Sequence, residues 1–492
     1  MSCLPLIPEY VVVKIIEIAF QNRWTRFDWR LSLATLSWRY FNHLSKSVDT
    51  FNLFDRTVVS HVTSPYCLMR EPRTIYTSLS NLNRLLRDPL SAGFLTTPSP
   101  FTTNVEQLVI VENSLFSMVS IIDISNFVAQ LPNLVRFHLE SNFNTITPNT
   151  FSILESTDAK IVDFQYLAPM PADSTALVSL IRKRAPSLQR LEYGHRSLMI
   201  SYENERIIYN EIISQHQSFT QLRSLTLQCG VSDTLNFFTL LLALQQLESL
   251  ALMCTYKAEA VARKQLASFL NHHDALRALK VTFLFDSQLT AAVNSRQRLR
   301  SIVMSPNVKL TQKYADLCFT SLDCLKLSSK LLAQTIELNL SGINNIRTLH
   351  IDLNQEEAIS LNEGSLATFI ETNNTCRLLK TQYTERIVGA FANNTSIDTV
   401  VFKSLEQNNP FFAPTFQQAL SKNSTVRNIF IYDYSQPATN KHILRELFNR
   451  VEQETQSVSN QFILLNIRQY IDESSMMTSE MSCTVVEYTK IS

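Results

Sequence analysis

The residues able to carry out chemistry are spread thinly along this chain and form none of the common catalytic motifs. The sequence has six glycines in 492 residues, at positions 93, 194, 230, 342, 364 and 389. Loops that bind phosphate need glycines within a few residues of one another, because the bare backbone must come close to the phosphate. No two glycines here are that close, and neither Gly-x-Ser-x-Gly nor His-Glu-x-x-His occurs. We therefore expect a protein that is not an enzyme and that holds no cofactor.

One pair of histidines and one pair of cysteines are candidate metal ligands. His272 and His273 are adjacent, so their side chains point apart on most backbones, and they lack the four-residue spacing of a zinc-binding helix. We predict a polar loop there. Cys229 and Cys254 occupy equivalent places after two neighbouring strands of the predicted fold. They could lie close together and oxidise or bind a metal, or they are small buried fillers. We assign no metal site.

Basic residues suggest a binding surface instead. They recur at the outward-facing positions of successive predicted strands, where alternate side chains point away from the core. In the C-terminal half the series ends with two aromatic residues, and its members are Lys280, Lys326, His350, Lys380, Lys403, Phe430 and Tyr432. Such a face suits an acidic or phosphorylated peptide. The alternative is a solvated row of lysines that keeps the sheet soluble. Nearer the N-terminus the outward positions include Arg136, His138, Glu140, Arg190 and Glu192.

These positions are set by a short strand pattern that recurs along the chain: apolar, two free, apolar, one free, apolar. It is clearest in residues 222–227 and 247–252. The copies begin at Val105, Leu134, Ile161, Leu188, Leu222, Leu247, Leu276, Leu299, Leu322, Ile346, Cys376, Ile397, Val426 and Phe462. Successive copies are about 27 residues apart, which is the period of a leucine-rich repeat. One such unit cannot bury its apolar side alone, so stacked copies share a core and present a long surface that binds other macromolecules.

Helix-like segments lie between the copies. Residues 177–184, 235–244 and 262–270 carry apolar side chains at three- and four-residue spacing. The order of helix, loop and strand predicts an α/β solenoid with a parallel sheet inside and helices outside. In the last third, three Asn-x-Ser/Thr triplets at 373–375, 394–396 and 423–425 precede the strand pattern. Asn tolerates a left-handed helix cap and short hydroxyl groups satisfy free backbone groups, so we expect these triplets at helix exits.

Composition limits the classes of function. Hydrophobic residues make up 45% of the chain and charged residues 18%, as in well-packed soluble proteins. The formal net charge of +1 gives no overall attraction to nucleic acid or membrane. Eight cysteines without a Cys-x-x-Cys pair favour reduced thiols in the cytoplasm or nucleus. The apolar stretch 235–244 is half of the roughly 20 residues that a membrane helix needs. We expect a soluble, non-secreted protein.

Residues 1–47 do not fit the repeat. In residues 7–21, the polar side chains Tyr10, Lys14, Glu17 and Gln21 fall on one narrow stripe of a helix. A helix with so thin a polar stripe must be covered on more than one side. Residues 30–44 show the same spacing around the single large side chain of Trp38. A module of about 40 residues buries too little surface to fold stably by itself, so it should pack against the solenoid, against a partner, or against both.

The N-terminal module resembles the F-box family. That family opens with a Leu-Pro-Glu-like triplet, continues with an aliphatic helix and a spacer, and ends in an aliphatic stretch that runs into a tryptophan. The matching residues are Ile7, Pro8 and Glu9, then Val12, Ile15 and Ile16, then Leu31, Leu33, Leu36 and Trp38. The resemblance covers residues 4–45; it departs in Ile7 for Leu and in a longer, aromatic-rich spacer, residues 22–29. An F-box followed by leucine-rich repeats is a common pairing in the family.

The resemblance implies a substrate receptor of a cullin–RING (SCF) ubiquitin ligase. Its F-box would dock on a Skp-family adaptor, and its repeats would bind a target protein. Such a receptor performs no chemistry; it raises the effective concentration of target lysines near the conjugating enzyme. Carried over residue by residue, the implied adaptor contacts are Ile7, Pro8, Val12, Ile15, Ile16, Leu31 and Trp38. Alternatively, these side chains pack the core of the module itself.

The expected domain layout has four parts. Residues 1–47 form the F-box-like module, 48–104 a capping or linker segment, 105–468 the solenoid and 469–492 a flexible tail. Residues 48–53 fit the strand pattern and are a candidate capping strand, whereas 54–104, with five prolines, hold either degenerate repeats or a linker. Two other functions remain open: a repeat scaffold without a ligase role, and a GTPase-activating repeat protein, for which no Arg or Asn stands out.

Overall fold

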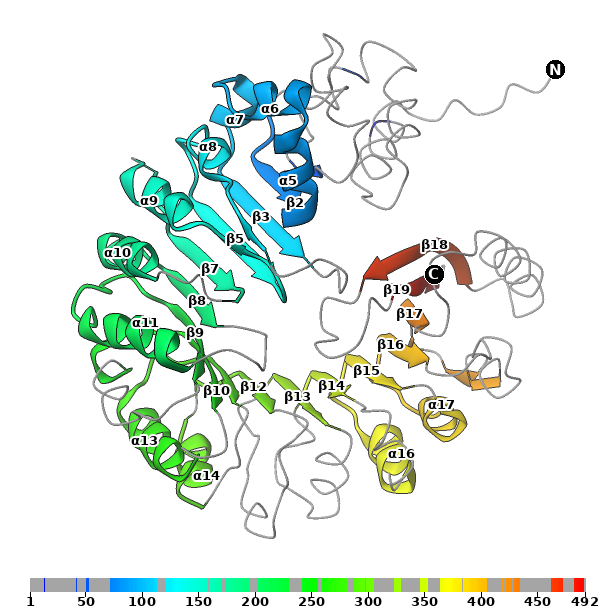
Figure 1. The fold of residues 1–492 in the computed structure, drawn as a ribbon. Helices are drawn as coiled ribbons and strands as arrows, with labels where there is room; N and C mark the ends of the chain where they lie inside the picture. Colours follow the sequence, from blue (N-terminus) through cyan, green and yellow to red (C-terminus); the bar gives the residue numbers. More distant parts are fainter. Residues whose placement is uncertain are drawn as a thin grey trace, which may run out of the picture. The chain divides into compact units, whose positions relative to one another are not determined.

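The chain forms two compact units, Met1–Ser224 and Leu225–Ser492. Strands alternate with helices along both (Figure 1). The structure, a computed structural model, describes residues 13, 41, 50–52, 71–112, 120–157, 159–169, 174–194, 202–229, 241–254, 259–281, 287–296, 298–304, 323–328, 346–352, 363–382, 384–404, 418–419, 422–423, 425–426, 428–433, 462–471 and 482–490. The implied adaptor contacts lie outside these residues: Ile7, Pro8, Val12, Ile15, Ile16, Leu31 and Trp38.

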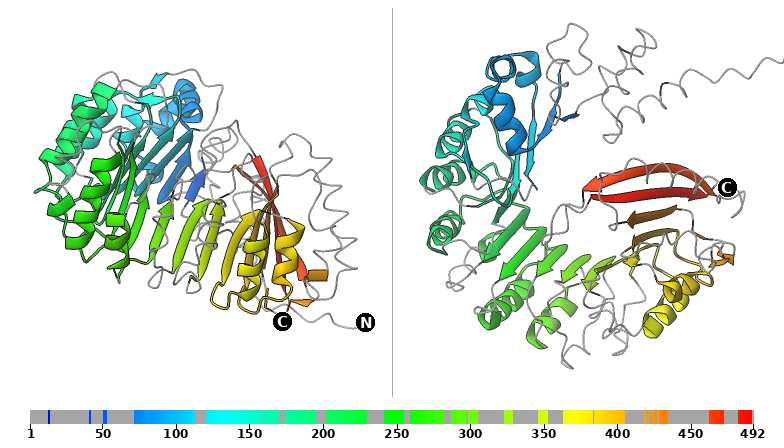
Figure 2. Two further views of the ribbon diagram at one scale, coloured as in Figure 1. Left: turned by 90° about the horizontal axis from the view of Figure 1, so that it is seen from below. Right: turned by 45° about the vertical axis from the view of Figure 1, so that its right-hand side comes forward.

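The first unit alternates short strands with helices. Its strands are β1 (Thr50–Asn52), β2 (Thr74–Thr77), β3 (Gln107–Glu112), β4 (Ile121–Ile122), β5 (Arg136–Ser141), β6 (Thr145–Ile146), β7 (Asp163–Leu167) and β8 (Arg190–Gly194). Its helices are α5 (Leu79–Arg87), α6 (Pro89–Leu95), α7 (Pro100–Thr103), α8 (Ser125–Val128), α9 (Pro148–Ser156), α10 (Thr175–Arg184) and α11 (Tyr202–Ser214). In two further views the helices lie along one face of the sheet (Figure 2).

The strands of the first unit are parallel and in register. Strands β1, β2, β3, β5, β7 and β8 pair in that order, which brings the middle apolar residue of each strand pattern into one row. That row is Phe51, Ile75, Leu108, Phe137, Phe164 and Leu191, and each of its side chains is buried. The rings of Phe137 and Phe164 stack at 5.7 Å. The predicted parallel α/β architecture is confirmed, because the apolar residues of neighbouring copies lie side by side.

The segment at 48–104 contains repeat-like structure. Strand β1 falls within the candidate capping strand, and its Phe51 is buried against Phe101, with ring centroids 4.8 Å apart. Strand β2 and helices α5 to α7 follow within residues 71–104, so this part is a further strand–helix unit and not a linker. Its Ile75 was missed as a copy of the pattern because prolines interrupt the flanking sequence.

The second unit continues the same alternation. Its strands are β9 (Ser224–Cys229, from the boundary onward), β10 (Ser249–Cys254), β11 (Ala278–Val281), β12 (Ser301–Met304), β13 (Cys324–Ser328), β14 (Thr348–Asp352), β15 (Leu378–Gln382), β16 (Thr399–Ser404), β17 (Asn428–Asp433), β18 (Phe462–Ile471) and β19 (Ser482–Lys490). Its helices are α13 (Glu259–His272), α14 (Ser287–Asn294), α16 (Glu363–Thr372) and α17 (Glu385–Phe391). Strands β10 to β17 pair in parallel, each with the next. No helix among the described residues has the length and apolar character needed to span a membrane.

Three buried asparagines mark the helix exits that the triplets predicted. The Oδ1 atom of Asn394 accepts hydrogen bonds from the amides of Ser396 and Ile397, both at 2.8 Å. Its Nδ2 donates to the carbonyls of Ile370 (2.6 Å) and Asn373 (2.7 Å) in the preceding repeat. Asn373 and Asn423 accept the equivalent pairs of amides. We call Asn373, Asn394 and Asn423 the asparagine ladder. All three side chains are buried and cap their own helix exits through Oδ1, and those of Asn394 and Asn423 also donate to the preceding repeat.

The prediction of a polar loop at His272 and His273 was partly correct, because the loop between α13 and β11 begins only at His273. His272 is the last residue of α13, whereas the side chain of His273 is buried. The Nε2 atom of His273 lies 2.7 Å from the carbonyl oxygen of Leu244, and its ring lies 4.6 Å from that of Phe269. His273 stands three residues before Leu276, the same distance by which each ladder asparagine precedes its strand pattern. This position is internal because the chain turns there from the helix into the sheet.

The C-terminal segment also differs from expectation. We expected a parallel copy beginning at Phe462 and a flexible tail over 469–492. Instead, β18 reaches Ile471, and β19 lies antiparallel between β17 and β18. Residues 482–490 are rich in β-branched and aromatic side chains, including Val485, Val486 and Tyr488, which favour a strand.

Candidate binding surface

The register of the second unit aligns the predicted basic residues. Across strands β11 to β17, one row runs Lys280, Val303, Lys326, His350, Lys380, Val401 and Phe430. Neighbouring strands are about 4.8 Å apart, so these positions are close neighbours. Lys403 and Tyr432 belong to the next row, opposite Gln382. All seven predicted residues therefore fall on two adjacent rows of one sheet.

Exposure can be assigned to two of these side chains. Lys280 is exposed between the buried residues Leu279 and Val281, as alternation in a strand requires. Lys380 is half-buried, beside the buried Thr381. For Lys326, His350, Lys403, Phe430 and Tyr432 the structure describes the strand position and not the side chain.

A second set of charged residues stands immediately before the strands, and the sequence reasoning missed it. The carbonyl of Arg277 accepts hydrogen bonds from the amides of Arg300 (2.8 Å) and Ser301 (3.0 Å). The carbonyl of Arg300 accepts in the same way from Asp323 and Cys324, and this arrangement repeats along the sheet. The residues in equivalent places are Glu248, Arg277, Arg300, Asp323, Arg347, Arg377 and Asp398. We call Arg277, Arg300, Arg347 and Arg377 the arginine edge.

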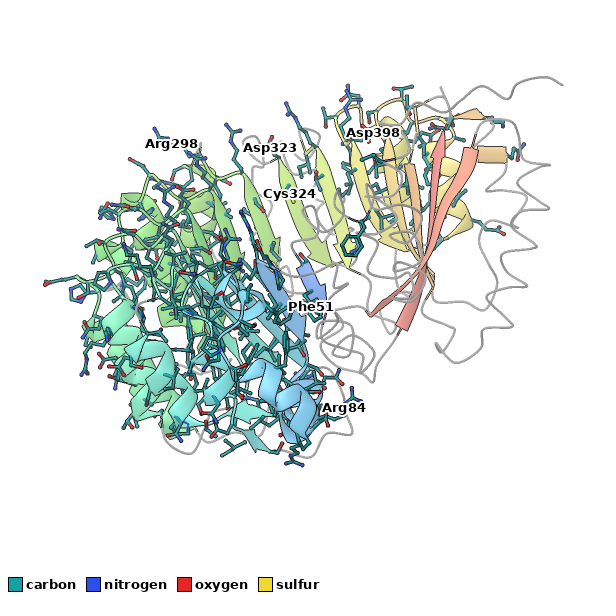
Figure 3. All side chains as sticks on the ribbon, turned by 90° about the horizontal axis from the view of Figure 1, so that it is seen from above. Phe51, Arg84, Arg298, Asp323, Cys324 and Asp398 are labelled. Atoms are coloured by element: carbon teal, nitrogen blue, oxygen red, sulfur yellow. The ribbon has the colours of Figure 1, made fainter. Side chains whose placement is uncertain are left out.

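The four arginines of this row are exposed, and its acidic members are half-buried. Figure 3 shows Asp323 and Asp398 along the same edge of the sheet. Asp323 lies between two arginines: its Oδ2 is 3.9 Å from Nη1 of Arg300, and its Oδ1 is 4.0 Å from Nε of Arg347. The side chains of Arg300 and Arg347 are 58% and 74% exposed. Arg377 donates from Nη1 to the carbonyl of Ser396 at 3.1 Å. Exposed ion pairs of this length contribute little to stability.

The outward positions of the first unit, by contrast, pair among themselves. Arg190 contacts Glu192, with 2.9 Å between Nη2 and Oε2, and its Nε lies 4.0 Å from Oδ1 of Asp163. Nε2 of His138 lies 3.5 Å from Oε2 of Glu140, whose side chain is largely buried. Acidic and basic residues alternate here, so this part of the sheet presents no single charge.

No metal-binding cluster is found in the described part of the chain. Within it, no three His, Cys, Asp or Glu side chains gather closely enough to hold a metal ion. Cys229 and Cys254 are the last residues of β9 and β10, and their side chains lie outside what is described. Burial raises the pKa of the Cys376 thiol to about 12, which disfavours its reactive thiolate form.

Comparison with known proteins gives little further information. No protein-family model matches the chain, and no curated protein matches it in sequence. Among solved structures, the chain is similar to one in a crystal structure of the Rad7 and Elc1 complex in yeast. The match has 14% sequence identity and a TM-score of 0.41, and it covers 83% of this chain and 92% of the other. A similarity of this size does not assign the chain to a family.

Proposed function

We propose that the chain is a leucine-rich-repeat receptor that selects targets for a cullin–RING (SCF) ubiquitin ligase. Residues 1–47 would dock on a Skp-family adaptor through Ile7, Pro8, Val12, Ile15, Ile16, Leu31 and Trp38. The repeats would hold the target. The observation that carries the proposal is the combination of an F-box-like sequence with in-register parallel strands that leave one set of side chains directed away from the core.

The proposed receptor acts by position and not by chemistry. A target bound to the repeats is held near the conjugating enzyme, so its lysines meet that enzyme at a high effective concentration. Rigidity matters for this role, since a flexible receptor would spread the target over a larger volume. Main-chain hydrogen bonds join successive repeats within the second unit and would restrict movement between them. We place the protein in the cytoplasm or nucleus, where such ligases act.

The target would contact the basic rows of the second unit. Lys280, Lys326, His350 and Lys380 share one row, and Lys403 and Tyr432 follow in the next. An acidic or phosphorylated segment fits that charge.

Reversing two charges, in Lys326→Glu with Lys380→Glu, should weaken target binding. Lys264→Glu, exposed on α13 of the same unit, is the matched control. Target binding that survives the double reversal would favour a merely solvated lysine row.

The ligase role is tested by co-purifying the full chain with a Skp-type adaptor. We expect a complex with the wild type, loss of it with Ile15→Asp and Ile16→Asp together, and retention with Lys14→Glu on the polar stripe. Circular dichroism of each variant separates loss of binding from loss of folding. If the wild type does not associate under conditions in which a known F-box protein does, the ligase role is wrong. The protein would then be a scaffold that uses the same sheet.

A further inference from the structure

We infer that the arginine edge of the second unit is a docking site for an acidic segment of a partner protein, one that carries its carboxylates in two groups. The edge comprises Arg277, Arg300, Arg347 and Arg377. It stands apart from the basic rows of the strands, and the inference does not depend on the ligase role, since an acidic segment could dock on a receptor or on a scaffold.

The backbone fixes the spacing of the four arginines. Each stands directly before a strand, and its carbonyl accepts two amides from the next repeat at 2.8–3.1 Å. The Cα positions therefore follow the strand spacing of about 4.8 Å. Arg277 and Arg300 occupy adjacent places, as do Arg347 and Arg377, and Asp323 occupies the place between the two pairs. The result is a fixed order of two positive charges, one negative charge and two positive charges.

Guanidinium groups suit carboxylates better than lysines do. The planar fork of Arg donates two parallel hydrogen bonds to one carboxylate, whereas Lys acts as a point charge. The carboxylate of Asp323 lies 3.9 Å from Arg300 and 4.0 Å from Arg347, which is longer than a bidentate contact. Partner carboxylates in bidentate geometry would make shorter contacts with side chains that are more than half exposed.

The same row of the first unit shows that the repeat does not require arginine there. The equivalent residues, identified by the same main-chain hydrogen bonds between repeats, are Arg73, Glu106, Val135, Val162, Gln189 and Arg223. They contain no adjacent arginines, although they hold the same backbone position. The four arginines of the second unit therefore are not explained by the architecture, and an anionic partner explains them.

The charge order favours a protein over a nucleic acid. Glu248, Asp323 and Asp398 stand in the same row as the arginines, and each would face the uniform negative charge of a phosphate backbone. A polypeptide can place a basic or neutral side chain opposite Asp323 and carboxylates on either side of it. An extended peptide advances about 3.3 Å per residue, so such a segment needs only a handful of residues to reach from Arg277 to Arg377.

The experiment measures fluorescence anisotropy of a labelled peptide with the core Glu-Glu-Gly-Lys-Glu-Glu, titrated with the full chain. Its charge-reversed counterpart Lys-Lys-Gly-Glu-Lys-Lys and a short single-stranded oligonucleotide are the comparison probes.

We expect the acidic peptide to bind the wild type. The double variant Arg300→Glu with Arg347→Glu should weaken this binding by about tenfold or more. Arg300→Lys with Arg347→Lys should weaken it less, because the charge stays and the fork is lost. Arg73→Glu, at the equivalent place in the first unit, should change the affinity by less than about twofold.

A gain-of-binding variant keeps the test independent of folding defects. Asp323→Lys should make the chain prefer a peptide whose central Lys is replaced by Glu. The inference is overturned if the reversals at Arg300 and Arg347 leave peptide affinity unchanged while Asp323→Lys fails to switch the preference. It is also overturned if the oligonucleotide binds more tightly than the peptide through the same arginines.

Discussion

The side chain of Asn423 donates a hydrogen bond to the main-chain carbonyl of Asn394, with 2.9 Å between Nδ2 and O. Asn394 makes the same contact with Asn373 at 2.7 Å. Asn394 and Asn423 thus each join the exit of their own helix to that of the preceding repeat, whereas the Nδ2 of Asn373 is buried without a hydrogen-bond partner among the described residues. Asn suits this place because its amide carries both an acceptor and two donors. In Asn394 one side chain hydrogen-bonds four main-chain groups, the amides of Ser396 and Ile397 and the carbonyls of Ile370 and Asn373.

Replacing Asn394 with Ala should destabilise the protein by about 3 kcal/mol, because two amides and the carbonyl of Ile370 would lose their side-chain partner in a buried site, and the carbonyl of Asn373 would keep only the hydroxyl of Ser396. Asn394→Asp should cost more, since it keeps the acceptor but turns a carboxylate toward the carbonyls of Ile370 and Asn373. Urea unfolding measures both. Asn393→Ala, next to it and exposed, should change the unfolding free energy by about 0.5 kcal/mol or less. Equal effects at both positions would contradict the ladder.

His273 should tolerate Asn better than Leu. It stands where the ladder has asparagine, and its Nε2 donates to the carbonyl of Leu244. Asn can keep that hydrogen bond, so His273→Asn should lose about 1 kcal/mol, mainly from the lost packing against Phe269. Leu fills the space but leaves the carbonyl without its donor, at a cost of about 2 kcal/mol. Thermal melting of the two variants gives the comparison, and a more stable Leu variant would show that packing dominates.

Arg184 at the end of α10 should be a stabilising residue despite its charge. Its Nη2 lies 2.7, 3.0 and 2.6 Å from the carbonyl oxygens of Leu154, Glu155 and Thr157, at the C-terminal end of α9. A cation there also opposes the negative end of the helix dipole. Arg184→Ala should cost about 2 kcal/mol in urea unfolding. Lys183→Ala, its exposed neighbour on the same helix, should have almost no effect.

Cys376 should make stability depend on alkaline pH. Burial raises the pKa of its thiol from 9.0 to about 12. Below pH 9 the thiol is protonated in both the folded and the unfolded state, so the protein keeps its full stability. As the pH rises above 9, the unfolded state ionises while the folded state does not, so stability falls until the folded thiol itself titrates. Between about pH 8 and pH 10, the wild type should lose about 1 kcal/mol more than Cys376→Ala. Parallel pH curves for the two proteins would refute this account.

Several features could be read from the sequence because they depend on neighbours along the chain. The strand pattern around Leu108, Phe137 and Leu250 identified buried strand residues, since alternation within one strand decides which side chains face the core. The Asn-x-Ser/Thr triplets likewise identified helix exits. Adaptor docking by residues 1–47 stays a prediction, as does target binding by the basic rows.

Other features required the packing of one repeat on the next. His273 looked polar because its partner, the carbonyl of Leu244, is 29 residues away in the sequence. The tail seemed loose because nothing local reveals that β19 pairs with β17.

The sequence by itself determined the alternation of strand and helix, because the spacing of apolar residues within each element decides which of its faces is buried. The tertiary structure decided which residues stand beside one another across repeats. The arginine edge is a product of the tertiary structure, because Arg277 and Arg300 are 23 residues apart in the chain and are joined by a main-chain hydrogen bond in the fold. The register between strands is set by the stacking of repeats, so it cannot be read from the sequence of one repeat.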